Sequence, residues 1–312
     1  MKKISIITPS YNEEDNVGQV VNKVRDIFSK ELKGYVYEHI FIDNASTDKT
    51  VEILCDIAKV DKNVKIIVNS RNFGHIKSPY HGLIQADGDA VILLASDLQD
   101  PVELIVDFVR EWEDGFLTVI GVKNKSKESS LMFFIRKIYY RILRKLSDVD
   151  IVENFTGFGL YDRKVVNILT KVKDPEPFLR GVISYIGLKT IEIEYTQPKR
   201  EKGKSKNNFY TLYDIGILGI ISNSKIPIRI TIFFGFFIAF TSFVIGLVYL
   251  IAKLIVWEDM ALGLAPIIVG QFFLFGMVFM FMGILGEYIG AIYIHVLDRP
   301  KVVEEKRINF DK

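Results

Sequence analysis

Residues 90–101 read AVILLASDLQDP, an apolar run that ends abruptly in acidic and amide side chains. The first five residues have the length and composition of a buried strand, whereas Asp97, Gln99 and Asp100 are too polar to continue it. Carboxylate and amide oxygens directly after a strand suit a hard divalent cation that also takes phosphate oxygens. For Asp100 we favour the alternative role of a helix start, with Pro101 in the first turn.

The same alternation extends on both sides of this stretch. Further β-rich apolar runs lie at 4–8, 37–43, 64–68 and 117–121. Helical stretches are expected between them, at 13–31, 47–59, 76–86 and 101–112. Strands that alternate with helices predict an α/β domain with a mostly parallel sheet covered on both faces. Ligands of such sheets bind beyond the carboxyl ends of the strands, so we expect the site on the loops that follow them.

Each of the first three strands is followed by residues that could contact a ligand. Tyr11 could stack on a base and Glu13 could accept hydrogen bonds from it, although a turn that starts the next helix is the alternative. Asp43, at the second strand end, can hold a polar ring edge or a ribose. Arg71, after the third, could contact phosphate. These loops match neither GxGxxG nor a Walker loop, which disfavours dinucleotide oxidoreductases and P-loop NTPases.

Composition excludes several other classes of protein. Lys and Arg total 40 against 38 Asp and Glu, a formal charge of +2, so the strong cationic excess of a nucleic-acid-binding protein is missing. The single cysteine, Cys55, rules out an intrachain disulfide and a Cys-based zinc site. The histidines show no HExxH or clustered spacing, which argues against a His-rich metal site.

Two long runs near the C-terminus, 230–252 and 260–286, carry no charged residue. Each exceeds the roughly 20 apolar residues that a helix needs to cross a bilayer core. We therefore expect membrane-spanning helices at 229–257 and 260–296. Two buried helices in a large soluble core are the alternative.

Charges around these runs indicate their orientation. Lys and Arg lie outside the pair, whereas the short connection carries Glu258 and Asp259. The positive-inside rule places both ends of this hairpin in the cytoplasm. The sequence thus predicts a multi-pass protein of the inner (plasma) membrane, with a cytoplasmic domain at 1–208, a juxtamembrane segment at 209–228 and a cytoplasmic tail at 297–312.

A basic amphipathic segment, LMFFIRKIYYRILRKL, occupies 131–146. Leu131, Ile135 and Ile138 recur at helical spacing, and Arg and Lys residues lie between them. Such a helix can lie in a membrane interface, which is the role we predict. An ordinary surface helix with a solvated charged face is the alternative.

Taken in order, four segments resemble motifs of the family 2 glycosyltransferases. They are ITPSYNEEDNV at 7–17, IDNASTDKT at 42–50, SRNFGH at 70–75 and SDLQDP at 96–101. With the C-terminal hairpin, nearly the whole chain is similar to the polyprenyl-phosphate sugar transferases, which include dolichol-phosphate mannose synthases and bactoprenol glycosyltransferases. The resemblance implies a GT-A-type nucleotide-sugar-binding domain and an inverting transfer that uses Mg²⁺ or Mn²⁺.

The resemblance also implies roles for individual residues. Those expected to contact the nucleotide sugar are Pro9, Tyr11, Glu13, Asp43, Arg71 and Lys123. Asp97 and Gln99 would bind the metal and the diphosphate. Arg200 and Lys206 belong to a segment that matches the family's R-x-x-G-x-S-K pattern, and they would clamp a phosphate of the donor or the lipid. Asp97, Arg200 and Lys206 are therefore the predicted catalytic residues, because cations stabilise the charge of a departing nucleoside diphosphate.

Two positions depart from the family pattern. The family commonly reads D-x-D-L-Q at the metal, but the first position here is Ala95. Many members read G-D-F-R-L-x-D-R further on, and Gly157 takes the place of that first aspartate, a candidate base. A lipid phosphate monoester is already largely ionised near neutral pH, so it needs positioning more than deprotonation. Gly157 leads us to expect a subgroup with a different donor sugar.

The sequence thus predicts an enzyme that moves a monosaccharide from a nucleotide sugar, a UDP-sugar by preference, to a polyprenyl phosphate such as undecaprenyl phosphate at the bilayer. Two alternatives stay open. One is a polymerising glycan synthase, and the other is a non-catalytic membrane scaffold that retains the fold, as Ala95 and Gly157 suggest. Small residues of the second apolar run, such as Gly276 and Gly283, would permit close helix packing in a homo-oligomer.

Overall fold

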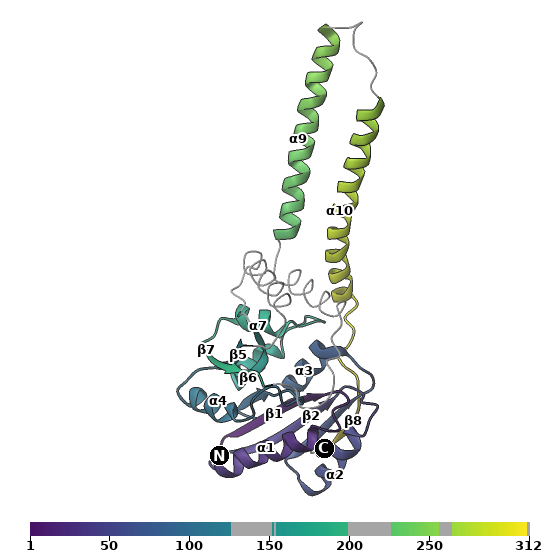
Figure 1. The fold of residues 1–312 in the computed structure, drawn as a ribbon. Coiled ribbons are helices and arrows are strands. Elements are labelled where there is room, and N and C mark those ends of the chain that lie inside the picture. The colour runs from purple at the N-terminus through teal and green to yellow at the C-terminus, as the bar shows by residue number, and fades with distance from the viewer. Residues whose placement is uncertain (126–151, 153, 199–225, 256–263, 311–312) are drawn as a thin grey trace.

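The computed structural model describes residues 1–125, 152, 154–198, 226–255 and 264–310 (Figure 1). The predicted interfacial helix at 131–146 and the two basic residues Arg200 and Lys206 lie outside the described residues. Most of the predicted juxtamembrane segment does so too.

An α/β domain is built from strands that alternate with helices, and a helical pair follows it. The strands are β1 (Lys3–Ser10), β2 (Val36–Asp43), β3 (Val64–Asn69), β4 (Ala90–Leu93), β5 (Thr118–Lys125), β6 (Phe155–Asp162), β7 (Thr190–Thr196) and β8 (Glu304–Ile308). The helices of the domain are α1 (Val17–Lys30), α2 (Thr50–Val60), α3 (Gly74–Gln85), α4 (Leu104–Glu113), α6 (Arg163–Leu169) and α7 (Leu179–Ile186). All five strands and four helices predicted from the pattern are present, with ends displaced by up to four residues.

The eight strands form one mixed sheet in the order β7-β5-β6-β4-β1-β2-β3-β8. Its centre, from β4 to β3, is parallel. The strand β6 runs antiparallel to both β4 and β5, and β7 is parallel to β5. The predicted α/β architecture with a mostly parallel sheet is confirmed. The chain adds β2 and β3 on one side of β1 and β4 on the other, so the strand order reverses beside β1.

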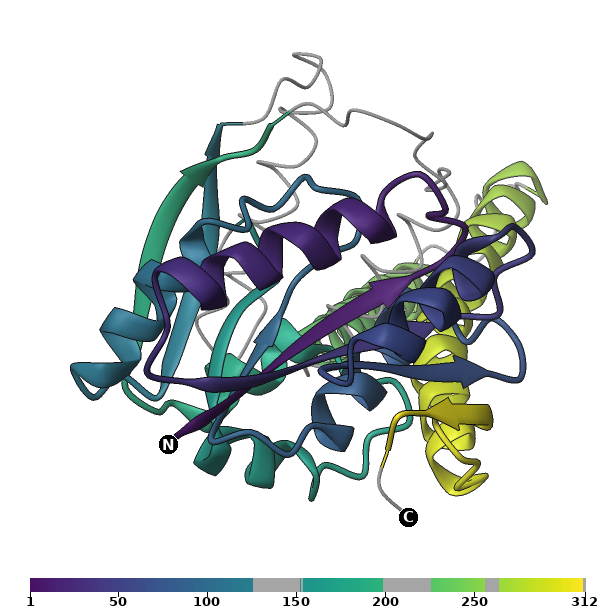
Figure 2. The same ribbon diagram turned by 90° about the horizontal axis from the view of Figure 1, so that it is seen from below.

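Helices cover both faces of the sheet (Figures 1 and 2). One buried apolar cluster joins α1, α2 and α4 to the sheet, and a second joins α3, α6 and α7 to the opposite face. The alternation of side chains along β2 shows the cause, because Phe41 belongs to the first cluster whereas Ile40 and Ile42 belong to the second. Burial on both faces explains why these strands read as continuous apolar runs.

The two charge-free runs form α9 (Ile226–Ile255) and α10 (Leu264–Val296). Both helices extend from the domain in the same direction and lie beside one another (Figures 1 and 2). Their most apolar stretches, Ile226–Ile245 and Phe273–Val296, are long enough to cross a membrane. Only 6% and 0% of these stretches is buried, so they are not core helices of the domain.

The segment after α10, which was predicted to be a cytoplasmic tail at 297–312, returns to the domain and joins its sheet. β8 pairs antiparallel with β3, placing Ile66 opposite Ile308 and Val68 opposite Lys306. The sheet therefore includes residues that follow position 208, the predicted end of the α/β domain. The sequence pattern missed β8 because only two of its five residues are even partly buried, so it lacks the apolar run of a central strand.

Candidate functional site

The sheet opens at the carboxyl ends of β1 and β4. Their pairing ends at Ile7 and Leu93, after which the Leu94 N–H donates to the Ile7 carbonyl at 2.9 Å. The backbone of Pro9 points toward the same neighbouring strand as the backbone of Ile7, namely β4. Because the pairing with β4 has already ended at Pro9, its missing N–H costs no sheet hydrogen bond. This opening is the point of strand-order reversal, where ligands of open α/β sheets bind.

The loops after β1 and β2 are joined by hydrogen bonds. The Asn12 N–H donates to Ser46 Oγ at 2.8 Å, and the Thr47 N–H donates to Asn12 Oδ1 at 2.7 Å. The Glu13 N–H donates to Thr50 Oγ1 at 2.8 Å, and Glu13 Oε2 accepts from Asn16 Nδ2 at 2.7 Å. The predicted ligand residues Tyr11 and Glu13 are thus carried on a loop whose backbone is fixed by its neighbour. Both readings of this loop, as a capping turn and as a binding loop, are compatible with that geometry.

Asp43 ends β2 and is fully buried. Its Oδ1 accepts the Ser46 N–H at 2.9 Å, and its Oδ2 accepts the Ser46 hydroxyl. Burial raises the pKa of the Asp43 carboxyl against the lowering effect of these hydrogen bonds. Asp43 is therefore an acceptor held in one orientation directly beside the β1 loop, where a base or ribose could be recognised.

The loop after β3 is tied to the same group through Asn44. Asn44 Nδ2 donates to Asn72 Oδ1 at 2.9 Å, and Asn44 Oδ1 accepts the Phe73 N–H at 2.9 Å. Arg71 on this loop is exposed, and its guanidinium carbon lies 4.2 Å from the centre of the Phe73 ring. The predicted contact of Arg71 with phosphate thus remains a prediction about a side chain on the rim.

The loop after β4 presents the predicted metal-binding residues. Asp97 and Gln99 are partly exposed, and the Gln99 N–H donates to Asp97 Oδ1 at 3.2 Å. Leu98 between them has φ +57°, a left-handed conformation that is costly for a leucine. Ala45, on the loop after β2, has a similar positive φ that is also costly, and Asn12, on the loop after β1, has one that asparagine tolerates better. Such strain is concentrated at functional sites in proteins.

Asp100 does not hold the predicted helix-start position, because α4 begins at Leu104 and the residue before it is Glu103, whose side chain makes no cap hydrogen bond. It is instead 6% exposed, and its Oδ1 accepts the Tyr195 hydroxyl at 2.7 Å. Burial raises the pKa of the Asp100 carboxyl, opposed by the Tyr195 hydrogen bond and the charge of Lys123. The predicted Lys123 lies on β5, opposite Tyr195 in the pairing of β5 with β7. Sequence reasoning missed Tyr195, because nothing in the local pattern links it to a residue 95 positions away.

Gly157 and Gly159 of β6 both lie where a side chain would be unfavourable. Gly157 has φ +103°, which an aspartate could adopt only with strain. A β-carbon on Gly159 would overlap the Val119 carbonyl oxygen of the adjacent β5. The local fold of β6 therefore requires glycine at 159 and favours it at 157. The expectation of a different donor sugar, drawn from Gly157, remains untested.

The residues at the β4 loop fit a divalent cation only in part. Among the described residues, no group of three or more His, Cys, Asp or Glu side chains could hold a metal ion. Asp97 and Gln99 offer one carboxylate and one amide oxygen, both hard donors. Mg²⁺ is commonly held by one or two carboxylates together with substrate phosphates and water. The donor set therefore fits a metal that arrives with a diphosphate, not a cation caged by protein alone.

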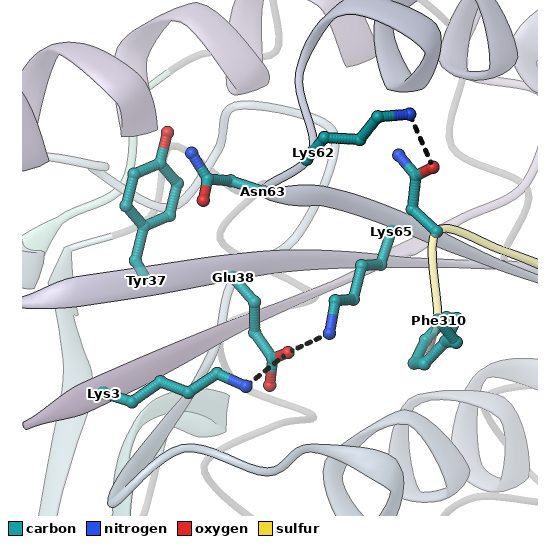
Figure 3. A pocket seen from close by; sticks show the side chains of 8 residues that line it. Lys3, Tyr37, Glu38, Lys62, Asn63, Lys65 and Phe310 are labelled. Atoms are coloured by element: carbon teal, nitrogen blue, oxygen red, sulfur yellow. Dashed lines mark hydrogen bonds and ion pairs between the residues drawn. The ribbon is translucent and has the colours of Figure 1, made fainter. Parts of the chain in front are cut away.

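A cavity of about 420 Å³ lies at the other end of the sheet, near the amino ends of β1, β2 and β3 (Figure 3). Its charged centre is Glu38, whose Oε2 lies 2.9 Å from Lys3 Nζ and 2.8 Å from Lys65 Nζ. Burial alone would raise the pKa of Glu38, but hydrogen bonds from Lys65, Ser5 and Lys3 outweigh it and lower the pKa to about 2. Both lysines share the Glu38 carboxylate, and Lys3 Nζ also lies 3.6 Å from Asp87 Oδ2, so this end shows a structural ion network.

Comparison with known proteins shows the family of this chain. The model of the family described as Glycosyl transferase family 2 matches residues 5–169. The SfII prophage-derived bactoprenol glucosyl transferase of Shigella flexneri is 34% identical over 305 residues, covering 97% of this chain and 98% of that protein. The glycosyltransferase YkcC of Bacillus subtilis is 32% identical over 305 residues, covering 97% and 93%. The putative glycosyltransferase CsbB of Bacillus subtilis is 34% identical over 302 residues, covering 95% and 89%.

The chain belongs to glycosyl transferase family 2. Its mixed sheet with helices on both faces is a GT-A-like α/β fold. The resemblance drawn from the four loop motifs is thereby confirmed, and so is its extension to the polyprenyl-phosphate sugar transferases, since the similarity to a bactoprenol glucosyl transferase covers nearly the whole chain.

Proposed function

We propose that this protein transfers a monosaccharide from a UDP-sugar to a polyprenyl phosphate at a membrane surface. The observation that carries the proposal is the extent of the similarity. The match to a protein named for glucosyl transfer to bactoprenol covers 97% of the chain, so it runs beyond residues 5–169 and through α9 and α10. An acceptor that is itself a membrane lipid accounts for both parts of the molecule.

The proposed reaction is a single in-line displacement. A phosphate oxygen of the lipid attacks the anomeric carbon, the bond from that carbon to the UDP oxygen breaks, and the configuration inverts. UDP leaves with the bonding electron pair, and cationic groups stabilise the charge on its β-phosphate. The phosphate monoester is already largely ionised near neutral pH, by analogy with a second phosphate pKa near 6. The protein then has to position the two substrates and exclude water.

In the proposed site the loops after β1 and β2 hold the nucleoside, with Asp43 as an oriented acceptor and Tyr11 as the stacking residue. Asp97 and Gln99 would hold Mg²⁺ or Mn²⁺ together with the diphosphate. That ion would supply positive charge to the departing UDP. Lys123, whose charge acts on the β4 loop, would add a second positive group near the diphosphate.

We further propose that α9 and α10 form a membrane-spanning hairpin with both ends on the cytoplasmic side of the inner membrane. The charge-free lengths and the basic residues outside them support this orientation. Held there, the domain would meet the lipid phosphate at a high local concentration instead of searching in three dimensions.

A donor panel tests the proposal. The full chain in membranes or nanodiscs receives undecaprenyl phosphate, a divalent cation and, separately, UDP-glucose, UDP-N-acetylglucosamine, UDP-galactose and GDP-mannose. We expect one lipid product heavier by a single sugar residue. Products that grow by several sugars would favour the polymerising synthase instead. Absence of any product or UDP release would favour the scaffold and overturn the proposal.

Lys206→Ala tests the phosphate clamp that the family motif implies. The substitution removes one cation from a segment expected to bind an anionic substrate. We expect at least a tenfold higher KM for the donor or for the lipid phosphate. Lys59→Ala, which alters an exposed lysine of α2, serves as the matched control. Unchanged kinetic constants in Lys206→Ala would remove this residue from the clamp.

A further inference from the structure

The hydroxyl of Tyr195 joins parts of the site that the sequence separates widely. It donates to Asp100 Oδ1 on the β4 loop at 2.7 Å, and the ring that carries it lies against Phe158 of β6. Tyr195 itself lies on β7, at the far edge of the sheet from β3. The β4 loop, β6 and β7 therefore meet at this one side chain.

The Tyr195 ring is held by tight packing, so its hydroxyl has a fixed position. The side chain is 5% exposed, and its ring lies edge-on to Phe158, with centroids 5.6 Å apart and an interplanar angle of 82°. A β-carbon on Gly121 would come within 3.1 Å of Tyr195 Cε1, so glycine at 121 makes room for the ring. A ring packed in this way holds its hydroxyl in one position.

The turn of the β4 loop beside Tyr195 contains a residue in an unfavourable backbone conformation. Leu98 has φ +57°, a left-handed conformation that is unfavourable for a residue with a β-carbon. Such a turn persists only if its surroundings hold it. Asp100, two residues after Leu98, is 6% exposed and accepts the Tyr195 hydroxyl, so the carboxyl-terminal end of the turn is anchored to β7.

We propose that Tyr195 is a positioning residue that acts through Asp100 to keep Asp97 and Gln99 in place for a metal-bound nucleoside diphosphate. The inference rests on the proposed function. Ala95 gives it particular weight, because the loop offers one fewer carboxylate than the family pattern and Asp97 has no second carboxylate beside it there. Of the two carboxylates on this loop, Asp100 is buried and bonded to Tyr195 and Asp97 is partly exposed, so a small displacement of Asp97 would weaken metal binding.

Calorimetric titration of the full chain in detergent with UDP, with and without MnCl₂, tests this role. We expect Tyr195→Phe to weaken UDP binding at least tenfold in the presence of Mn²⁺. In EDTA the wild type and Tyr195→Phe should bind UDP with affinities within about twofold, because the nucleoside loops are intact. Tyr185→Phe, a change at an 80% exposed tyrosine of α7, is the matched control and should bind as the wild type does.

A second pair of variants keeps the test decisive if Tyr195→Phe folds poorly. Asp100→Asn retains an acceptor for the Tyr195 hydroxyl, whereas Asp100→Leu has a similar volume and no acceptor. We expect the Leu variant to lose several times more Mn²⁺-dependent affinity for UDP than the Asn variant. Equal losses in the two variants would mean that charge and not the hydrogen bond matters, which would overturn the inference.

The outcomes separate this inference from the proposed function. If the wild type binds UDP with Mn²⁺ and Tyr195→Phe binds equally well, the positioning role is wrong and the proposed function stands. If the wild type binds no UDP under any condition, both are wrong. A loss in Tyr195→Phe that is equally large in EDTA would show general damage to the domain and would also refute a role confined to the metal-bearing turn.

Discussion

The side-chain oxygen of Asn12 accepts a hydrogen bond from the backbone N–H of Thr47 at 2.7 Å, across 35 positions of the chain. In return the Asn12 N–H donates to Ser46 Oγ at 2.8 Å, in the same loop after β2. Asn12 has φ +55°, a conformation that asparagine tolerates better than most residues. One residue therefore links the two loops proposed to hold the nucleoside and also satisfies the backbone of both.

We expect Asn12→Ala to destabilise the domain by about 1–2 kcal/mol, because it removes the Thr47 acceptor and places alanine at a positive φ. UDP binding should weaken in parallel, since the two loops would no longer be fixed. Asn12→Gly, which restores the backbone freedom but not the acceptor, should recover part of the stability. Thermal melting and UDP titration measure the two effects, and the exposed Asn167→Ala is the control. Wild-type melting of Asn12→Ala would contradict the proposed linkage.

Asp97→Asn is expected to reduce metal-dependent sugar transfer by at least about 100-fold, because the amide keeps the shape but loses the anionic ligand. The melting temperature should change little, since Asp97 is partly exposed and outside the apolar clusters. Asp107→Asn, at an exposed position of α4, is the matched control. Transfer at the wild-type rate in a folded Asp97→Asn protein would refute the metal role of Asp97.

Lowering the pH should destabilise the folded domain, because the folded state disfavours protonation of the buried His39 side chain. This side chain is 1% exposed and hydrogen-bonds Thr8 Oγ1 at 2.9 Å, and burial lowers its pKa to about 3. The unfolded chain, with a pKa near 6.5, binds one more proton between pH 6.5 and 3, so stability falls as the pH falls through that window. From pH 7 to 5 the wild type should lose about 2 kcal/mol more than His39→Gln.

The pH dependence of the melting temperature of both proteins measures this difference. The range stops at pH 5 because Glu38, whose pKa is lowered to about 2, loses its own stabilising effect only as the pH falls below its ordinary value of 4.5. Parallel curves for the wild type and His39→Gln would show that His39 is not the group responsible.

Two glycines should respond to alanine in opposite directions. A β-carbon at Gly159 would overlap the Val119 carbonyl oxygen, so Gly159→Ala should cost roughly 1–3 kcal/mol or more of stability. Gly18 of α1 has open space around it, and Gly18→Ala should gain up to about 1 kcal/mol from helix propensity. Melting of the two single variants checks the pair. A stable Gly159→Ala protein would contradict the close contact of β5 with β6.

Much of the site was predictable from local pattern. The apolar runs predicted the ends of β1, β2 and β4 within two residues; Asp43 ends β2, and the loops after β1 and β4 carry Tyr11 and Asp97. The reason is that both signals are short-range, since a buried strand requires consecutive apolar residues and its carboxyl end presents whatever follows. The reversal of strand order beside β1 then brings the loops together without further information from the sequence.

Contacts between distant segments could not be predicted in that way. Asp100 was assigned to a helix start because an Asp-Pro pair fits one locally, yet its partner Tyr195 lies 95 positions further on. The exposed strand β8 joins β3 across more than 230 positions, and its few partly buried residues give no apolar signal. The positive φ of Gly157 likewise depends on how β6 meets its neighbours.

The amino-acid sequence by itself thus determined the alternating elements, the two long apolar helices and the polar loops, because periodicity and local charge are written in neighbouring residues. Only the tertiary structure decided which edge β8 covers, where Tyr195 meets Asp100 and which glycines are sterically required. Those features depend on packing and hydrogen bonds between segments that are far apart in the chain. A local sequence pattern contains no information about such contacts.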